Sequence, residues 1–313
     1  MNKCKIVAYH YVRPIKNSQY PEIKGLELEE FKKQIEYFRK EFNFITAKQM
    51  IDCIYENRNI PDRSILLTFD DGLKDNYLHV FPILKKFKIQ GLFFPPVKPI
   101  IEKIVLDVHK IHFILAMCKN KKQIIDIIFK QINQYKNEYN LQDPSSYYSQ
   151  LAKKNRFDTD EIIFIKRILQ RELPLKLRKI IIQTLFKKFV TTNEKDFSEN
   201  LYLSIEEIKE MKESDMYFGS HGYSHVWFSY LSEHEKEVEV EESLKFFHKL
   251  GINTNNLIMC YPYGDYDKEI INHLKKRNFK AGLTVKMGDS RLDKLNAFSL
   301  ERYDTNDFKD KII

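Results

Sequence analysis

Strand and helix patterns alternate along the first hundred residues, and this alternation constrains the fold more than any other feature of the sequence. A β-prone run over 6–12 predicts a strand, and apolar side chains at helical spacing over 28–42 predict the helix that follows it. Thr46 is expected to cap a second helix. The continuously apolar run 64–69 is typical of a strand buried on both faces. Such alternation predicts a mostly parallel sheet or barrel.

The alternation stops near residue 101 and resumes near residue 200. Between these points the patterns are helical, rich in Ile, Phe, Lys and Gln, with hardly any strand signal. A helix with a kink at Pro82 is expected over 77–88, and another near 266–278. Further strands are predicted at 91–94, 216–219, 256–261, 281–285 and 296–301. We therefore expect an α/β fold, a distorted (β/α)7-type barrel formed by 1–100 and 200–313, with a helical basic insertion at 101–199.

Positive charge is concentrated in the insertion. From Lys103 to Val190 the chain has 18 Lys and Arg against 8 Asp and Glu, a net charge of +10, which leaves −2 for the rest of the total of +8. Basic helices are more often solvated faces than nucleic-acid sites, so we expect no nucleic-acid partner. An anionic membrane surface is a candidate partner for the insertion. The oligomeric state is not predicted.

Composition limits the class of protein. No run of about 18 apolar residues is present, so no membrane span is expected. The apolar run after Met1 is too short for a secretory signal. We therefore expect a cytoplasmic protein, at most peripheral to the inner face of the membrane. Disulfides and thiolate metal sites are not expected, because the cysteines are far apart and form no CxxC pair: Cys4, Cys53, Cys118 and Cys260.

Two adjacent carboxylates, Asp70 and Asp71, end the strand predicted at 64–69 and precede a glycine. An ordinary Asp-Gly turn at the surface is one explanation. However, ligands of α/β proteins sit at the carboxyl ends of parallel strands. Neighbouring acids at such a position need a cation, or one of them must hold a proton.

Two histidines, His221 and His225, follow another predicted strand. Their spacing of four residues predicts that both imidazoles lie on one face of a helical turn, which is common for metal ligands. With nine histidines in the chain, a chance pair is the alternative. One carboxylate and two imidazoles leave open positions on a divalent ion, as a catalytic site requires. One aspartate would then bind the metal while the other acts as a base.

A third segment, Tyr261-Pro262-Tyr263-Gly264, ends a further predicted strand. Pro and Gly favour a tight, rigid turn that would direct the backbone N–H of Tyr263 into the cavity. Such a donor suits a developing oxyanion. A simple Pro-Gly turn with packed tyrosines is the alternative.

These three segments, 68–72, 220–225 and 261–264, together resemble the motifs of the polysaccharide deacetylase family, also called carbohydrate esterase family four. The similarity covers about 1–100 and 200–310. The resemblance implies a metal-dependent hydrolase that removes an N-acetyl or O-acetyl group from a sugar. By position, it makes Asp71, His221 and His225 the metal ligands, Asp70 the general base and Tyr263 the backbone donor. Zinc is the expected metal, with cobalt and nickel as alternatives.

Two departures from the family pattern stand out. Cys260 stands where the family usually has an arginine that orients the base. Arg13 and Arg302 are the candidates to replace that arginine. Arg302 is preferred because it follows a predicted strand. The last motif, a strand ending in histidine, is absent near the C-terminus, where His273 is expected on a helix surface. The run 6–10 is also an apolar strand that ends in a histidine, as in a branch of the family with a permuted N-terminal strand. This resemblance makes His10 the candidate general acid. The alternative is that His10 is only a buried, hydrogen-bonded histidine.

Aromatic side chains near the predicted metal would bind the sugar, and Tyr223, Trp227 and Tyr261 are the candidates, although aromatics also simply pack. The substrate would be a surface polysaccharide, a lipid-linked glycan or a nucleotide-sugar precursor. Two other functions are considered. One is a hydrolase of another C–N amide bond on the same scaffold, and the other is a catalytically silent protein that binds a glycan or an anionic surface.

Overall fold

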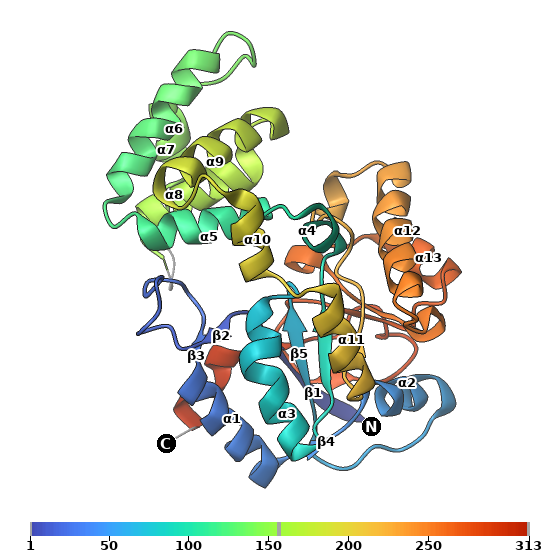
Figure 1. Cartoon of the computed structure of the whole chain (residues 1–313). Helices are drawn as coiled ribbons and strands as arrows, with labels where there is room; N and C mark the ends of the chain where they lie inside the picture. Colours follow the sequence, from blue (N-terminus) through green and yellow to red (C-terminus); the bar gives the residue numbers. More distant parts are fainter. Residues whose placement is uncertain (1, 155–157, 312–313) are drawn as a thin grey trace. The chain divides into compact units, whose positions relative to one another are not determined.

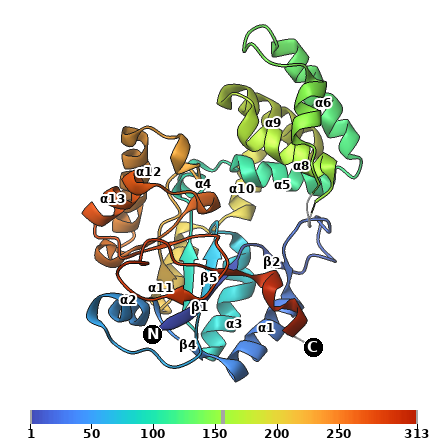
Figure 2. The same cartoon turned by 180° about the vertical axis from the view of Figure 1, so that it is seen from behind.

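The computed structural model describes residues 2–154 and 158–311. The chain divides into two compact units, each described here by itself (Figures 1 and 2). The barrel unit comprises Met1–Pro14, Gly25–Ile104 and Ser198–Ile313. The helical unit comprises Ile15–Lys24 and Val105–Phe197. Residues 15–24 were predicted to belong to the barrel, but their contacts group them with the helices.

The barrel unit contains the strands and most of the helices that alternate with them. Its strands are β1 (Lys3–Tyr9), β2 (Val12–Arg13), β3 (Leu26–Glu27), β4 (Asn43–Phe44), β5 (Ser64–Asp70), β6 (Gly91–Phe94), β7 (Tyr217–Phe218), β8 (Ile258–Cys260), β9 (Ala281–Leu283), β10 (Ser290–Arg291) and β11 (Tyr303–Asp304). Its helices are α1 (Leu28–Glu41), α2 (Ala47–Glu56), α3 (Phe81–Phe87), α4 (Val97–Glu102), α11 (Ile205–Glu213), α12 (Glu233–Lys249) and α13 (Lys268–Lys276). The α/β class with a parallel sheet is confirmed.

The parallel strands follow one another around a ring. β1 lies between β5 and β11 and is parallel to both, and β6 and β7 continue the sheet beyond β5. A parallel bridge from Ser220 to Met259 leads to β8, which pairs with β9. A second parallel bridge, from Leu283 to Leu300, leads to the segment that ends in β11. In the described residues the ring therefore has seven parallel segments, β1 included, as a distorted barrel requires.

A row of aromatic rings runs across neighbouring strands on the face that α1 covers, where Phe31 contacts both Tyr9 and Phe69. Tyr9 of β1 stacks on Phe69 of β5 at 5.0 Å, and Phe69 stacks on Phe93 of β6 at 4.9 Å. Phe218 of β7 lies 5.7 Å from Phe93. Every residue of β5 is buried, which explains the continuously apolar run in its sequence.

The helix predicted over 77–88 is present, and one other local prediction was wrong. Residues Asn76–Val80 form a π-helical turn that continues directly into α3, where Pro82 is the second residue. The N–H of Phe81 bonds to the carbonyl of Asn76, five residues earlier, so this wider turn lies immediately before the proline, and the kink at Pro82 stays a prediction. The strand predicted over 296–301 is shifted, because residues 294–298 form turns and pairing begins at Leu300.

The helical unit contains α5 (Asp107–Met117), α6 (Lys121–Tyr135), α7 (Pro144–Leu151), α8 (Asp160–Arg167) and α9 (Leu175–Phe189). The next helix, α10 (Glu194–Leu201), crosses the boundary between the units. The mostly buried Lys110 ammonium lies 2.7 Å from a carboxylate oxygen of Glu194 and donates to Gln183 at 2.7 Å. Among the described residues, no helix has the length and apolar character that crossing a bilayer demands.

Candidate active site

The acid pair lies in a left-handed turn at the carboxyl end of β5. Asp71 has a φ of 69° and Gly72 a φ of 58°. A Cβ atom at position 72 would lie 2.5 Å from the Cβ of Pro95, so only glycine fits this turn. Because the chain reverses here, the two carboxylates meet different partners: Asp70 meets Arg302 and Cys260, and Asp71 meets two histidines.

Asp71, His221 and His225 form a buried group with the geometry of a metal site. The Oδ1 atom of Asp71 lies 3.5 Å from Nε2 of His221 and 3.3 Å from Nε2 of His225, and the three ligand atoms all lie within 4.8 Å of one another. Tetrahedral zinc with bonds of about 2.0–2.1 Å places its ligand atoms about 3.3–3.4 Å apart. The three side chains therefore fit a small divalent ion.

The tautomer of His221 is suited to this task. Its Nδ1 atom lies 2.6 Å from the backbone carbonyl oxygen of Cys260. Since a carbonyl oxygen only accepts, Nδ1 carries a proton, which leaves Nε2, the atom that faces Asp71, as the one that would ligate a metal. Such a backbone contact also fixes the orientation of a metal-binding imidazole.

The histidines do not lie on a helical turn, so that interpretation was wrong. Residues 221–225 form an irregular loop after β7, in which Gly222 has a φ of 73° and His225 a φ of 56°. Left-handed residues interrupt helical hydrogen bonding. The two imidazoles converge because this loop folds back, not because of helical periodicity.

Asp70 forms a separate buried cluster beside the first. Nη1 of Arg302 lies 2.9 Å from both carboxylate oxygens of Asp70, and each of the two side chains is 2% exposed. Arg302 is fixed in turn by the backbone carbonyl of Thr284, at 2.8 Å, and by the hydroxyl of Thr68, at 3.2 Å. The thiol of Cys260 donates to Asp70 at 3.4 Å. Arg302 thus lies where it can orient this carboxylate.

Electrostatics keep Asp70 ionised. Burial raises the pKa of Asp70, but Arg302, His10 and His221 together lower it by more, so its pKa lies below the ordinary value. Burial also raises the pKa of the Cys260 thiol, although Arg302 opposes the shift, so the thiol remains a hydrogen-bond donor.

Arg13 and His10 were also predicted to lie near Asp70. Nε of Arg13 pairs with Asp75 at 2.7 Å, so Arg302 and not Arg13 is the partner of Asp70. Nε2 of His10 lies 3.8 Å from Oδ2 of Asp70, and its side chain is 49% exposed. The alternative of a buried histidine is therefore wrong, and His10 is the solvent-accessible group beside the carboxylate.

Aromatic rings border the metal group. Tyr263, in a turn with a φ of 58°, stacks on Trp227 at 4.4 Å with an angle of 4° between the rings, and its ring lies 4.7 Å from that of His225. Tyr230, which is 57% exposed, lies 6.4 Å from Trp227. Tyr230 was not predicted from the sequence, because nothing in its spacing distinguishes it from other tyrosines.

Two of the predicted sugar-binding aromatics have other contacts. Tyr261 is fully buried and its hydroxyl donates to the carbonyl of Phe298, so no sugar can stack on it and that prediction was wrong. The hydroxyl of Tyr223 donates to Glu102 at 2.6 Å, and its backbone carbonyl accepts from the N–H of Lys98 at 2.8 Å. Tyr223 therefore connects the histidine loop to α4.

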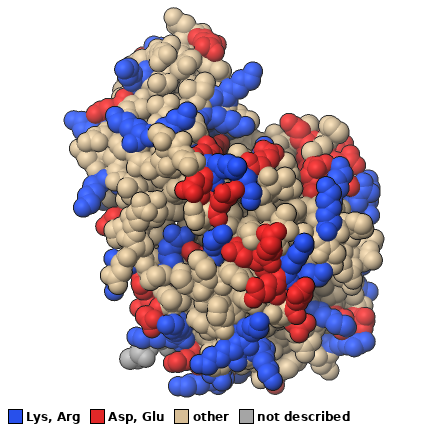
Figure 3. Space-filling view, viewed as in Figure 1, with Lys and Arg blue, Asp and Glu red and all other residues tan. Residues whose placement is uncertain are grey.

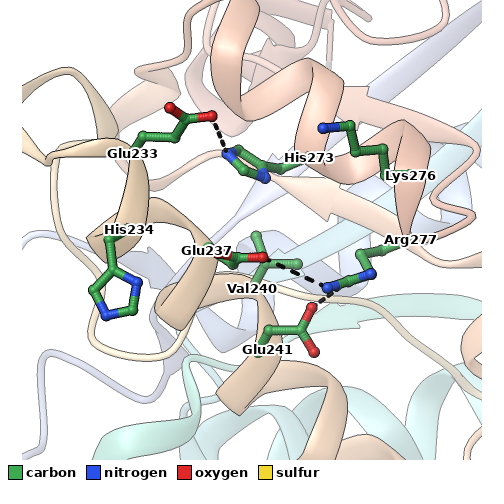
Figure 4. Close-up of a pocket in the computed structure, with 8 residues that line it drawn as sticks. All are labelled: Glu233, His234, Glu237, Val240, Glu241, His273, Lys276 and Arg277. Atoms are coloured by element: carbon green, nitrogen blue, oxygen red, sulfur yellow. Dashed lines mark hydrogen bonds and ion pairs between the residues drawn. The ribbon is translucent and has the colours of Figure 1, made fainter.

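One other group of described side chains is a weaker candidate for a metal. Asp70, His221 and Cys260 also converge, but the adjacent Arg302 cation would oppose a metal ion there. A hollow of about 510 Å³ lies between α12 and α13. Figure 4 shows the side chains that line it. Its charged side chains form ion pairs, such as Glu233 with His273 at 3.7 Å and Glu237 with Arg277 at 3.6 Å. His273 lies on a helix, as expected.

Comparisons with known proteins agree with this geometry. A family model described as polysaccharide deacetylase matches residues 57–109 and 185–282. The putative polysaccharide deacetylase YxkH of Bacillus subtilis (strain 168) is 25% identical over 99 residues, which are 32% of this chain and 35% of that protein. The match therefore spans about a third of that relative's length.

Solved structures share the fold. The Streptococcus pyogenes deacetylase PplD, determined in complex with acetate, has a TM-score of 0.59 at 16% identity, covering 99% of this chain and 98% of that one. IcaB from Ammonifex degensii has a TM-score of 0.51 at 20% identity, covering 91% and 85%. The chain is therefore similar to polysaccharide deacetylases in part of its sequence and in its fold.

Proposed function

We propose that the protein is a metal-dependent deacetylase that hydrolyses an N-acetyl or O-acetyl group on a sugar of a surface polysaccharide, a lipid-linked glycan or a precursor. The observation that carries this proposal is the pair of neighbouring clusters at one end of the ring, Asp71 with two imidazoles and Asp70 with Arg302. Zinc, cobalt or nickel held by Asp71, His221 and His225 would acidify a bound water and polarise the acetyl carbonyl.

The other side chains have distinct roles in this proposal. Asp70, kept ionised and oriented by Arg302, accepts the proton of the attacking water. The backbone N–H of Tyr263 stabilises the oxyanion, a contribution of about 3–4 kcal/mol for a well-placed donor. His10, the accessible residue, delivers a proton to the departing amine, which is otherwise a poor leaving group.

The position of β1 supports the proposed role of His10. β1 lies between the first strand of the common order, β5, and the last segment of the ring, β11. A strand placed there brings its carboxyl end to the same edge as Asp70. We therefore assign the chain to the branch of the family with a permuted N-terminal strand.

Accessible aromatic rings support a sugar substrate. Trp227 stacks on Tyr263, whose ring contacts His225, and the exposed Tyr230 lies beside Trp227. Flat aromatic faces next to the reacting group suit the apolar faces of a pyranose. Acetate release from a panel of N-acetyl sugars distinguishes this substrate from a cyclic or formyl amide, which the same scaffold would also accommodate.

We also propose that the helical unit approaches an anionic membrane surface from the cytoplasmic side. Its two segments, 15–24 and 105–197, contain 20 Lys and Arg against 11 Asp and Glu, a net charge of +9, which leaves −1 of the total of +8 for the barrel unit. Lys and Arg outnumber acidic side chains over this unit in Figure 3. Such charge attracts acidic lipids.

The deciding experiment combines metal analysis with Asp70→Asn. The variant should keep its metal, because Asp71 and the histidines remain, and should lose at least about 100-fold in kcat, because the base is gone. Asp75→Asn is the matched control, since it alters a carboxylate of the same segment that pairs with Arg13. Loss of metal from Asp70→Asn together with activity would contradict the assigned roles.

A further inference from the structure

The loop that presents the two histidines is held by a carboxylate from a distant helix. Glu239 of α12 is mostly buried, and its Oε2 atom accepts the backbone N–H groups of Tyr223 and Ser224, each at 2.8 Å. Its Oε1 atom accepts a short hydrogen bond from the hydroxyl of Ser224. All three bonds go to the stretch between His221 and His225.

The same face of α12 makes a second contact with this loop. Ser243, one helical turn beyond Glu239, shares a hydrogen bond of 2.7 Å with the hydroxyl of Ser220. That hydroxyl accepts the backbone N–H of Gly222 at 3.1 Å. Three successive N–H groups of the loop, from Gly222 to Ser224, are therefore fixed directly or indirectly by one face of one helix.

Gly222 makes room for this arrangement. A Cβ atom at position 222 would lie 3.1 Å from Oε2 of Glu239, and the φ of 73° is one that side-chain-bearing residues rarely adopt. The close approach of carboxylate and backbone explains why a glycine separates the first histidine from Tyr223. The glycine thus allows both the left-handed turn of the loop and the close approach of the Glu239 carboxylate.

We propose that Glu239 is a positioning residue that fixes the loop so that both imidazoles face Asp71. This inference rests on the metal site of the proposed function. The loop has no helical hydrogen bonds of its own, so its shape depends on acceptors supplied from outside it. A carboxylate is suited to this role, because it accepts several hydrogen bonds at once and offers no competing donor.

The expected consequence is a loss of metal affinity when the loop is released. Groups that orient metal ligands without touching the metal typically contribute 10- to 100-fold to affinity. Glu239→Ala removes all three hydrogen bonds and should weaken zinc binding by about 10- to 100-fold. Glu239→Gln can still accept both N–H groups and donate to the Ser224 hydroxyl, so its affinity should stay closer to that of the parent.

The matched control is Glu237→Gln on the same helix. Glu237 is half-exposed and pairs with Arg277 at 3.6 Å, away from the loop, so the same loss of charge should leave zinc affinity unchanged. Zinc affinity is measured by competition with a chelator on the full chain, and the visible absorption of the cobalt-loaded protein reports ligand geometry. Thermal unfolding of each protein without metal separates loop positioning from general stability.

The outcomes distinguish this inference from the function on which it rests. If Glu239→Ala lowers the unfolding temperature but binds zinc as the parent does, Glu239 is merely structural and the inference is overturned. If the zinc affinities follow the expected order but the parent releases no acetate from any sugar, the inference stands and the proposed substrate is wrong. A parent protein that binds no zinc would overturn both.

Discussion

The barrel unit and the helical unit both bury charged side chains, but they use them differently. In the helical unit Lys110, Glu194 and Gln183 hydrogen-bond to one another, and Glu194 also accepts the N–H of Val105 at 2.9 Å. In the barrel unit the charged side chains gather at strand ends, where a carboxylate and two imidazoles face one another. A cluster whose polar atoms hydrogen-bond to one another stabilises the fold. A cluster whose ligand atoms all face one point is suited to bind an ion or a substrate.

The largest effect is expected at the buried pair of the barrel unit. Arg302→Met removes the cation beside Asp70 and should lower the free energy of unfolding by about 3–5 kcal/mol, because a buried carboxylate is left with too little compensation. Urea unfolding measures this change. Adding Asp70→Asn should restore part of the loss. If the single variant is as stable as the parent, this pair does not hold the site together.

A smaller effect is expected in the helical unit. Lys110→Met should cost about 2 kcal/mol in that unit, because a charged hydrogen bond to Glu194 is lost. Burial raises the pKa of Glu194, but Lys110, the N–H of Val105 and Gln183 lower it by more, to below its ordinary value. The stability from this group is therefore present above the pKa of the unfolded chain and is lost as the pH falls through the folded-state pKa.

Hydrogen exchange of the α5 and α9 amides measures both changes. Protection should decrease with acidification in the parent and depend less on pH in Lys110→Met, while zinc affinity of the barrel unit stays unchanged at neutral pH. An equal loss of zinc binding in this variant would show that the two units are not separable in this way.

The smallest effect concerns the basic surface. Lys179 is exposed on α9, and Ile180 beside it is 38% exposed. Lys179→Gln should weaken binding to vesicles containing phosphatidylserine by about fivefold, since each lysine near an acidic surface contributes about 1 kcal/mol. Lys33→Gln, an exposed lysine of α1, is the control. If Lys33→Gln weakens vesicle binding as much as Lys179→Gln does, the helical unit is not the part of the protein that binds the acidic surface.

Much of the site was predictable because parallel strands bring their carboxyl ends to one edge. Asp70, Asp71 and His221 each follow a strand with a clear apolar pattern, so their meeting follows from topology. Arg302 was only one of two candidates, since the sequence does not show which arginine points inward; the structure pairs Arg13 with Asp75.

Other features depend on contacts that leave no local signal. Glu239 lies in a helix rich in glutamate, and its sequence neighbours do not distinguish it from the solvated ones. The left-handed conformation of Gly222 and His225 is also not indicated by the spacing of the histidines. Likewise, nothing in residues 15–24 indicates that they pack with helices that follow about ninety residues later.

The double pairing of β1 has a consequence for synthesis of the chain. Val7 pairs in register with both Leu67 and Tyr303, so the ring closes only after the last of its segments has left the ribosome. Asp71 and both imidazoles are translated well before Arg302. The nascent protein therefore holds the three residues proposed to bind the metal early, and gains the arginine that pairs with Asp70 much later.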